Sequence, residues 1–273
     1  MFRIVTFAAA TGLCVFVAYG QVASPPHVSR DALKADGAFG FPQKQAQVLC
    51  DTPDLRVSVI NDGAYLFVQA ILWKDDNDEV GETDDGRKIG DWSTLALDMD
   101  ADGKATGKID REYSLNPWPS LPGLHYSVLI DERGNSGLTG DSKGRGSIQY
   151  VAADDGKKTR VDNFLIPLEE IGRKAGDKVR FAYWGSSVKP QLRVNSVGFT
   201  SEKRYYAHSL PRDKFHELKL AERKPLLDPD KTPEGRGTIA ITRAEKKPMP
   251  EAGSVPPEIA AEKWFNWTGE KPP

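Results

Sequence analysis

Acidic side chains at alternating positions form the clearest chemical pattern in this sequence. Asp98, Asp100 and Asp102 stand two residues apart, and Gly103 follows them where a tight loop needs a glycine. Hard cations such as calcium take several oxygen ligands that a turn brings together. The spacing therefore predicts a calcium site, to which Asp76 would add a carboxylate from a second acidic stretch. The alternative is a solvated acidic hairpin, in which Asp and Gly are ordinary turn residues.

Aromatic side chains outside the expected strands suggest a sugar-binding site, because a flat ring can stack on the apolar face of a pyranose. Trp118 lies between two prolines, which cannot supply the hydrogen bonds of a sheet, so we expect it in a loop. Trp73 at the end of an apolar run is a second candidate. Tyr113, Asn116 and His125 are near Trp118 in sequence and would supply hydrogen bonds. The alternative is that Trp118 plugs one end of the fold.

Other large aromatic residues fit core packing better than ligand binding. Trp92, Trp184 and Tyr65 stand within apolar runs, and large aromatic side chains are usually buried to a high degree. We therefore expect these three rings inside the fold.

Catalysis is not predicted. Glycoside hydrolysis needs two carboxylates that face each other across a cleft, whereas the acidic residues here cluster in turns. The four histidines are scattered, and no serine stands in a nucleophile-elbow motif. The formal net charge of -2 gives no reason to expect nucleic acid as a partner. The sequence predicts a binding protein and no enzyme.

Short apolar runs, separated by Asp, Gly, Asn and Pro, predict an all-β chain between Leu55 and Leu220. Asn61-Asp62-Gly63 is typical of a hairpin turn. Many short strands at this spacing indicate an antiparallel β-sandwich of the jelly-roll or immunoglobulin-like kind. The expected strands are Leu55–Ile60, Ala64–Trp73, Trp92–Met99, Leu124–Asp131, Ser147–Ala153, Arg160–Ile166 and Lys178–Trp184.

The two ends of the chain differ from this region. Residues 1–20 have the cationic start and short apolar run of a signal peptide, which predicts a secreted or periplasmic protein with no membrane attachment after cleavage. A retained anchor is the alternative. Cys50 would then be the single cysteine, so no intramolecular disulfide is expected. Residues 223–273 are rich in Pro, Lys, Glu and Gly, which predicts a largely irregular tail in which Trp264-Phe265-Asn266-Trp267 docks.

Several motifs in residues 29–222 resemble the family 9 carbohydrate-binding modules and the wider DOMON-like sandwiches. They are Leu33–Gly37, Ala64–Val68 followed by Trp73, Asp75 and Asp76, Asp91-Trp92 with Leu95–Asp98, Ile166–Leu168 with Gly176–Phe181, and His208 with Phe215 and Leu218–Leu220. Phe39 and Phe41 stand where that family carries a tryptophan in its first strand. The resemblance implies a β-sandwich that binds a plant or microbial polysaccharide or its fragments.

Two further resemblances leave other functions open. Some DOMON-like sandwiches bind haem through a methionine and a histidine, which Met99 and His125 would supply. Pro256–Trp267 resembles the lead-in to exported thioredoxin-like domains, although no Cys-x-x-Cys motif is present. The chain would then be an accessory module of a redox protein. A hydrolase is the other possible partner protein.

Overall fold

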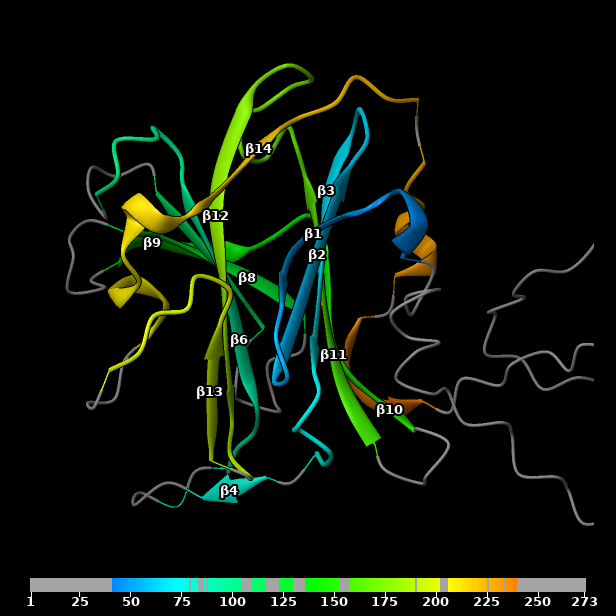
Figure 1. Ribbon diagram of the computed structural model, residues 1–273, viewed down its shortest axis with the longest axis vertical. Helices are drawn as coiled ribbons and strands as arrows, with labels where there is room; N and C mark the ends of the chain where they lie inside the picture. The colour runs from blue at the N-terminus through cyan, green and yellow to red at the C-terminus, as the bar shows by residue number, and fades with distance from the viewer. Residues whose placement is uncertain are drawn as a thin grey trace, which may run out of the picture.

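The computed structural model describes residues 41–239, except for 79, 83–85, 87, 105–109, 116–122, 130–135, 153–157, 190, 202–205, 225 and 233. Two β-sheets lie face to face in this part of the chain (Figure 1). The helical elements described are short 3-10 turns, at Gln43–Gln45 (η1), Ala207–Ser209 (η2), Arg212–Lys214 (η3) and Pro229–Lys231 (η4). The predicted all-β sandwich is confirmed. Within the described residues, no helix is long and apolar enough to cross a membrane.

The first sheet has the strand order β1-β2-β3-β11-β10-β15. Its neighbours are antiparallel except for β15 and β10, which run parallel. The predicted hairpin turn joins β2 to β3. The bounds are Gln47–Asp51 (β1), Leu55–Asn61 (β2), Tyr65–Leu72 (β3), Lys158–Pro167 (β11), Arg145–Ala152 (β10) and Gly235–Ile239 (β15).

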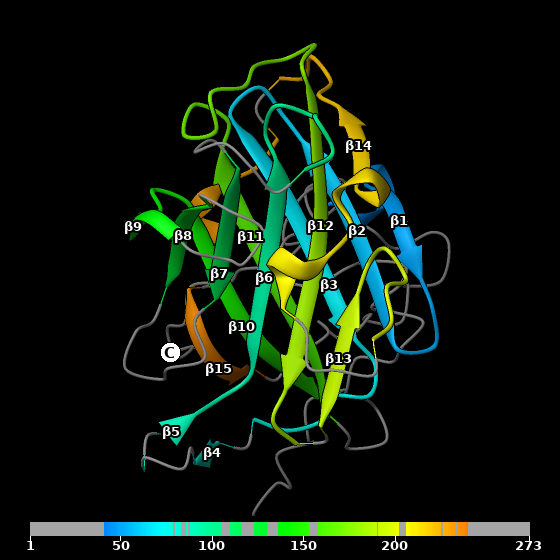
Figure 2. The ribbon, with the colours of Figure 1, turned by 90° about the vertical axis from the view of Figure 1, so that its left-hand side faces the viewer.

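The second sheet has the order β13-β12-β6-β7-β8-β9, and β14 also pairs with β12 (Figure 2). Its described neighbours are all antiparallel. A separate two-stranded ribbon joins Gly81–Glu82 (β4) to Lys88–Ile89 (β5). The remaining bounds are Leu192–Asn195 (β13), Lys178–Ser187 (β12), Trp92–Asp98 (β6), Arg111–Leu115 (β7), Leu124–Leu129 (β8), Ser136–Asp141 (β9) and His216–Lys219 (β14).

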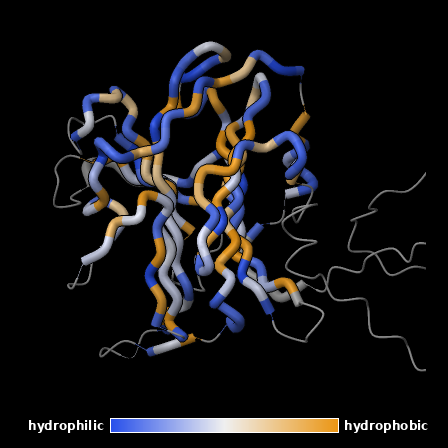
Figure 3. The backbone as a smooth tube through the Cα atoms, in the orientation of Figure 1, coloured by the Kyte–Doolittle hydropathy of each residue, from blue (hydrophilic) through white to orange (hydrophobic). Residues whose placement is uncertain are grey.

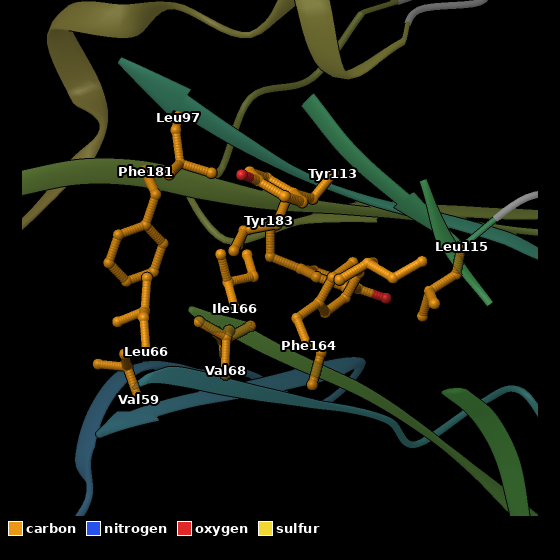
Figure 4. Close-up of a cluster of buried hydrophobic side chains, with 14 of the residues drawn as sticks. Val59, Leu66, Val68, Leu97, Tyr113, Leu115, Phe164, Ile166, Phe181 and Tyr183 are labelled. Atoms are coloured by element: carbon orange, nitrogen blue, oxygen red, sulfur yellow. The ribbon is translucent and has the colours of Figure 1, made fainter. Parts of the chain in front are cut away.

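The core lies between the inner faces of the two sheets, and period-2 alternation along each strand supplies it. Val68 and Phe164 of the first sheet pack in the same cluster as Leu97, Phe181 and Tyr183 of the second (Figure 4). Figure 3 shows hydrophobic residues along the strands of both sheets. Because each such side chain contributes about 1.5–3 kcal/mol when fully buried, this layer is the main source of stability.

The outer face of the first sheet carries a second, smaller apolar cluster. Phe41, one of the two phenylalanines at the expected tryptophan position, is 3% exposed and meets the Phe67 ring edge-on at 4.8 Å. Ile60, Leu165 and Leu227 complete this cluster. Phe41 is thus a core residue.

Part of the segment expected to be irregular belongs to the fold. The Asp62 carboxylate accepts hydrogen bonds from the backbone N–H groups of Leu226 and Leu227, each at 2.8 Å. Farther along, β15 pairs with β10 over five residue pairs. The structure differs from the expectation at Gly235–Ile239, because backbone hydrogen bonds to a sheet edge form a strand that side-chain composition does not indicate. Residues 240–273, with the tryptophan-rich segment, and residues 1–40, with the signal segment, lie outside the described residues.

Candidate functional site

A row of four polar residues crosses the outer face of the second sheet. Thr94 of β6 lies opposite Ser114 of β7, which lies opposite His125 of β8, which lies opposite Asp141 of β9. The first three point outward because their strand neighbours, among them Leu95, belong to the inner core cluster. Strand pairing thereby collects residues that are up to 47 positions apart in the sequence (141 minus 94).

The polar row contains two hydrogen-bonded pairs. The Thr94 and Ser114 hydroxyl oxygens lie 3.1 Å apart, and His125 Nδ1 lies 2.8 Å from Asp141 Oδ1. His125 Nε2 is buried and has no hydrogen-bond partner among the described residues. The Asp141 side chain is 89% exposed and that of His125 is 26% exposed. A buried ring nitrogen without a partner is unfavourable, so a hydrogen bond from a ligand or a water molecule to Nε2 would be stabilising.

Aromatic side chains border this row over β6 and β12. The Trp92 ring meets Trp184 edge-on at 5.1 Å and lies 5.7 Å from Tyr206. Tyr206 in turn stacks on His208 at 5.5 Å. The segment that carries η2 and η3 passes over β12 and β6 in Figure 2. Trp184 is 1% exposed, which confirms its predicted core role. Trp92 and Tyr206 are partly exposed.

A cluster of charges lies at the next position along β7. Glu112 points to the same outer face as Ser114, and its Oε1 lies 3.9 Å from Nη2 of Arg212. Arg212 Nε lies 3.9 Å from Oδ2 of Asp110. Burial raises the pKa of Glu112 to about 7, although the nearby guanidinium opposes the shift. At these separations a hydroxyl group could bridge carboxylate and guanidinium, since it both donates and accepts.

The three predicted cation ligands come together. Asp98, Asp100 and Asp102 each place a carboxylate oxygen within 4.8 Å of the others. Asp98 is buried; its Oδ2 accepts hydrogen bonds from Arg180 Nη1 at 3.0 Å and from the Gly103 N–H at 3.3 Å. Its Oδ1 has no hydrogen-bond partner among the described residues. This donor set fits a hard cation.

Asp76 lies outside that group. Its side chain is exposed, and its Oδ1 accepts a hydrogen bond from Asn77 Nδ2 at 3.0 Å. It follows β3 at the end of the first sheet, whereas the three-carboxylate group follows β6 of the second sheet. The prediction that Asp76 would join the cation site is therefore not supported by the arrangement of these residues.

Among the described residues, the other predicted binding residues are not gathered into one place. Tyr113 points to the inner face, is 0% exposed and accepts a hydrogen bond from Arg111 Nη1 at 3.2 Å. It thus lies on the opposite face of the sheet from His125, because the two residues differ in parity along paired strands. Trp73 follows β3 in the first sheet and is partly exposed. Trp118 and Asn116 lie outside the described residues.

The two residues of the haem alternative also lie on different faces. Met99 packs against the core cluster between the sheets, and His125 is on the outer face, bonded to Asp141. Axial ligands must face one common space, and these two side chains do not.

Sequence reasoning missed four residues of the outer face, namely Ser114, Asp141, Glu112 and Arg212. The alternation in Arg111-Glu112-Tyr113-Ser114-Leu115 is the local signal that would have found β7. Only the strand order places its polar positions beside His125.

Comparisons with known proteins concern the fold. No family model and no curated protein matches this sequence. A family 9 carbohydrate-binding module from Caldicellulosiruptor kristjanssonii, solved with cellotriose, is 15% identical, with 66% of this chain and 85% of that chain covered and a TM-score of 0.38. A family 9 module from the same organism, solved with glucose, is 14% identical, with 68% of this chain and 88% of that chain covered and a TM-score of 0.36.

A third solved structure is also similar to this chain. A protein from Bacteroides uniformis, assigned provisionally to carbohydrate binding, is 10% identical, with 70% of this chain and 89% of that chain covered and a TM-score of 0.43. Two of these three solved structures are family 9 carbohydrate-binding modules. At this similarity the likeness is one of fold, and a function has to come from the chain's own residues.

Proposed function

We propose that this protein binds a polysaccharide or oligosaccharide, without catalysis, on the outer face of the second sheet over β7 and β8. The observation that carries the proposal is the row of Ser114, His125 and Asp141, which continues inward to the buried Thr94, beside the partly exposed Trp92. Sugars present hydroxyl groups that donate and accept, together with apolar C–H faces. A polar row bordered by aromatic rings matches both features.

The His125–Asp141 pair is suited to forming a hydrogen bond with a sugar hydroxyl group. In the neutral tautomer whose Nδ1–H donates a hydrogen bond to the Asp141 carboxylate, Nε2 is left as an acceptor. Ser114, directly opposite on β7, adds a hydroxyl that turns to donate or accept. Because both residues sit on paired strands, little conformational entropy is lost when a ligand binds.

Trp118 remains a candidate for the stacking ring of the same site. It belongs to the connection between β7 and β8, the two strands that carry Ser114 and His125. If it binds sugar, Trp118→Ala loses affinity with little change in Tm. If it instead plugs the sandwich, the substitution costs about 3–5 kcal/mol of stability.

Binding to an array of plant and microbial polysaccharides tests the proposal. We expect His125→Ala and Ser114→Ala to weaken binding at least about tenfold, equivalent to about 1.4 kcal/mol each, while Tm stays near that of the original protein. Glu217→Gln, which changes an exposed carboxylate on β14, is the matched control and should bind normally. The location is wrong if both outer-face variants bind as well as the control, and the function is wrong if no saccharide binds.

We also propose that calcium binds at Asp98, Asp100 and Asp102 and stabilises the fold. The supporting observation is the buried Asp98 Oδ1, which has no hydrogen-bond partner among the described residues. The nearby Asp110 is also buried; its Oδ2 lies 3.9 Å from Arg212 Nε and has no hydrogen-bond partner among the described residues. Buried carboxylate oxygens left bare are costly, and a divalent cation would offset that cost.

A further inference from the structure

One guanidinium group joins the two sheets inside the sandwich. Arg160 of β11 is fully buried, and it binds Asp162 through two hydrogen bonds, Nε to Oδ1 at 2.8 Å and Nη2 to Oδ2 at 2.9 Å. Its Nη1 donates to Asp75 Oδ2 at 3.1 Å and to the Ser186 carbonyl at 2.9 Å. The same Nη1 lies 3.6 Å from Asp91 Oδ2. Three buried carboxylates thus share one buried cation.

Tyrosines and a backbone group satisfy two of the three carboxylates. Tyr183 of β12 donates to Asp162 Oδ2 at 2.6 Å. Tyr150 of β10 donates to Asp91 Oδ2, and the Val188 N–H donates to Asp91 Oδ1 at 2.9 Å. These bonds satisfy carboxylate oxygens of Asp162 and Asp91 that would otherwise be buried without partners.

Asp75 is the exception in this cluster. It is 0% exposed, and its Oδ1 has no hydrogen-bond partner among the described residues. An unpartnered buried charge costs far more than an unpartnered neutral oxygen. Burial raises the pKa of Asp75 to about 7; Arg160 opposes that rise, and the charges of Asp91 and Asp162 add to it.

Two of the carboxylates in this cluster belong to residues that lie next to tryptophans in the sequence. Asp75 lies two residues after Trp73, and Asp91 lies immediately before Trp92. Trp73 follows β3, and Trp92 opens β6 and borders the outer face of the second sheet. Arg160 therefore fixes both ends of the segment between the sheets.

We propose that Asp75 is a proton-binding site, and that proton release from it loosens the chain at Trp73 and Trp92. With the proton in place, Asp91, Asp162 and Arg160 leave one uncompensated negative charge in the core. Without the proton on Asp75, the core holds two uncompensated negative charges. This inference concerns the core and does not depend on which ligand the outer face binds.

The direction of the pH effect follows from proton linkage. The pKa of Asp75 is higher in the folded protein than in the unfolded chain, where an aspartate titrates near about 3.9. Its stabilising contribution is fully present below that unfolded value and is lost as the pH rises through the folded value of about 7. Protonation of Asp75 in acid therefore stabilises the cluster around Arg160, and ionisation of Asp75 at mildly alkaline pH destabilises it.

Tm and tryptophan emission, measured from about pH 5 to about pH 9, test the proposal. The original protein should lose Tm as the pH rises toward about 7 and level off above it, and its tryptophan emission should shift in a step with a midpoint near about 7. Asp75→Asn, a neutral isostere, should lack that step. Asp76→Asn is the matched control, since it removes an adjacent but exposed carboxylate. It should keep the step.

A step that persists unchanged in Asp75→Asn would overturn the proposal, because another group such as a histidine would then be its source. If Asp75→Asn does not fold, the carboxyl carbon of Asp75 in the original protein can be titrated by carbon-13 NMR. A midpoint near about 4, the value of an unperturbed aspartate, would equally overturn it. Neither result bears on the saccharide-binding proposal, which the outer-face variants test.

Discussion

A single charged side chain that is buried can have a large effect on the free energy of unfolding. Replacing Arg160 by methionine would leave Asp75, Asp91 and Asp162 in the core without their shared cation. Removal of one partner from a buried ion pair typically costs about 3–5 kcal/mol. We expect Arg160→Met to lower the free energy of unfolding by about that amount in urea denaturation.

Lys178→Met is the control for this prediction. Lys178 pairs with Glu217 on the surface, with side chains 62% and 47% exposed. Exposed ion pairs contribute less than about 1 kcal/mol. Equal losses in the two variants would show that Arg160 is not the centre of the buried network.

Residue type alone did not separate binding residues from core residues. Tyr113 and His125 were both expected beside the ligand, yet Tyr113 faces the core and His125 faces outward. A one-residue change in strand position reverses the face. The expected strands did not include β7, although the alternation around Tyr113 indicates it, so the parity of Tyr113 was not used.

At the scale of elements, the β2–β3 turn anchors the C-terminal segment. Asp62 accepts four backbone hydrogen bonds, from Ala64 and Tyr65 in its own turn and from Leu226 and Leu227, all at 2.8 Å. Burial alone would raise the pKa of Asp62, but these four donors lower it below its ordinary value. The ionised carboxylate therefore stabilises the folded state.

Asp62→Asn should weaken this anchor, since an amide offers one acceptor oxygen in place of two. We expect a loss of about 1.5–3 kcal/mol at neutral pH, the usual worth of hydrogen bonds to a charged group. The contribution is present above the unfolded pKa and disappears as the pH falls through the lowered folded pKa. The difference between the variant and the original protein should therefore shrink below about pH 4.

Urea denaturation at neutral and acid pH measures this effect, with Asp228→Asn as the control. Asp228 accepts one hydrogen bond, from the Asp230 N–H, and its side chain is 47% exposed. A gap between Asp62→Asn and the original protein that does not change with pH would contradict an electrostatic origin.

Calcium acts at the scale of the whole molecule, because a ligand that binds only the folded state raises stability by RT ln(1 + [L]/Kd). With calcium in excess of Kd we expect Tm to rise, and chelator should reverse the rise. Asp100→Ala, which removes an exposed member of the carboxylate group, should abolish it. Asp213→Ala changes a nearby exposed carboxylate and should retain it. Identical melting curves with calcium and with chelator would exclude the site.

The sequence by itself determined the all-β architecture, the hairpin turn at residues 61–63 and the grouping of Asp98, Asp100 and Asp102. These features depend on alternation, turn chemistry and short spacings, which operate over a few residues. Only the tertiary structure decided which strands are neighbours. Strand order brings Thr94, Ser114, His125 and Asp141 into one row, encloses Arg160 with its three carboxylates and adds β15 to an edge of the first sheet. Long-range pairing and register have no local signature, because they are set by how the whole core packs.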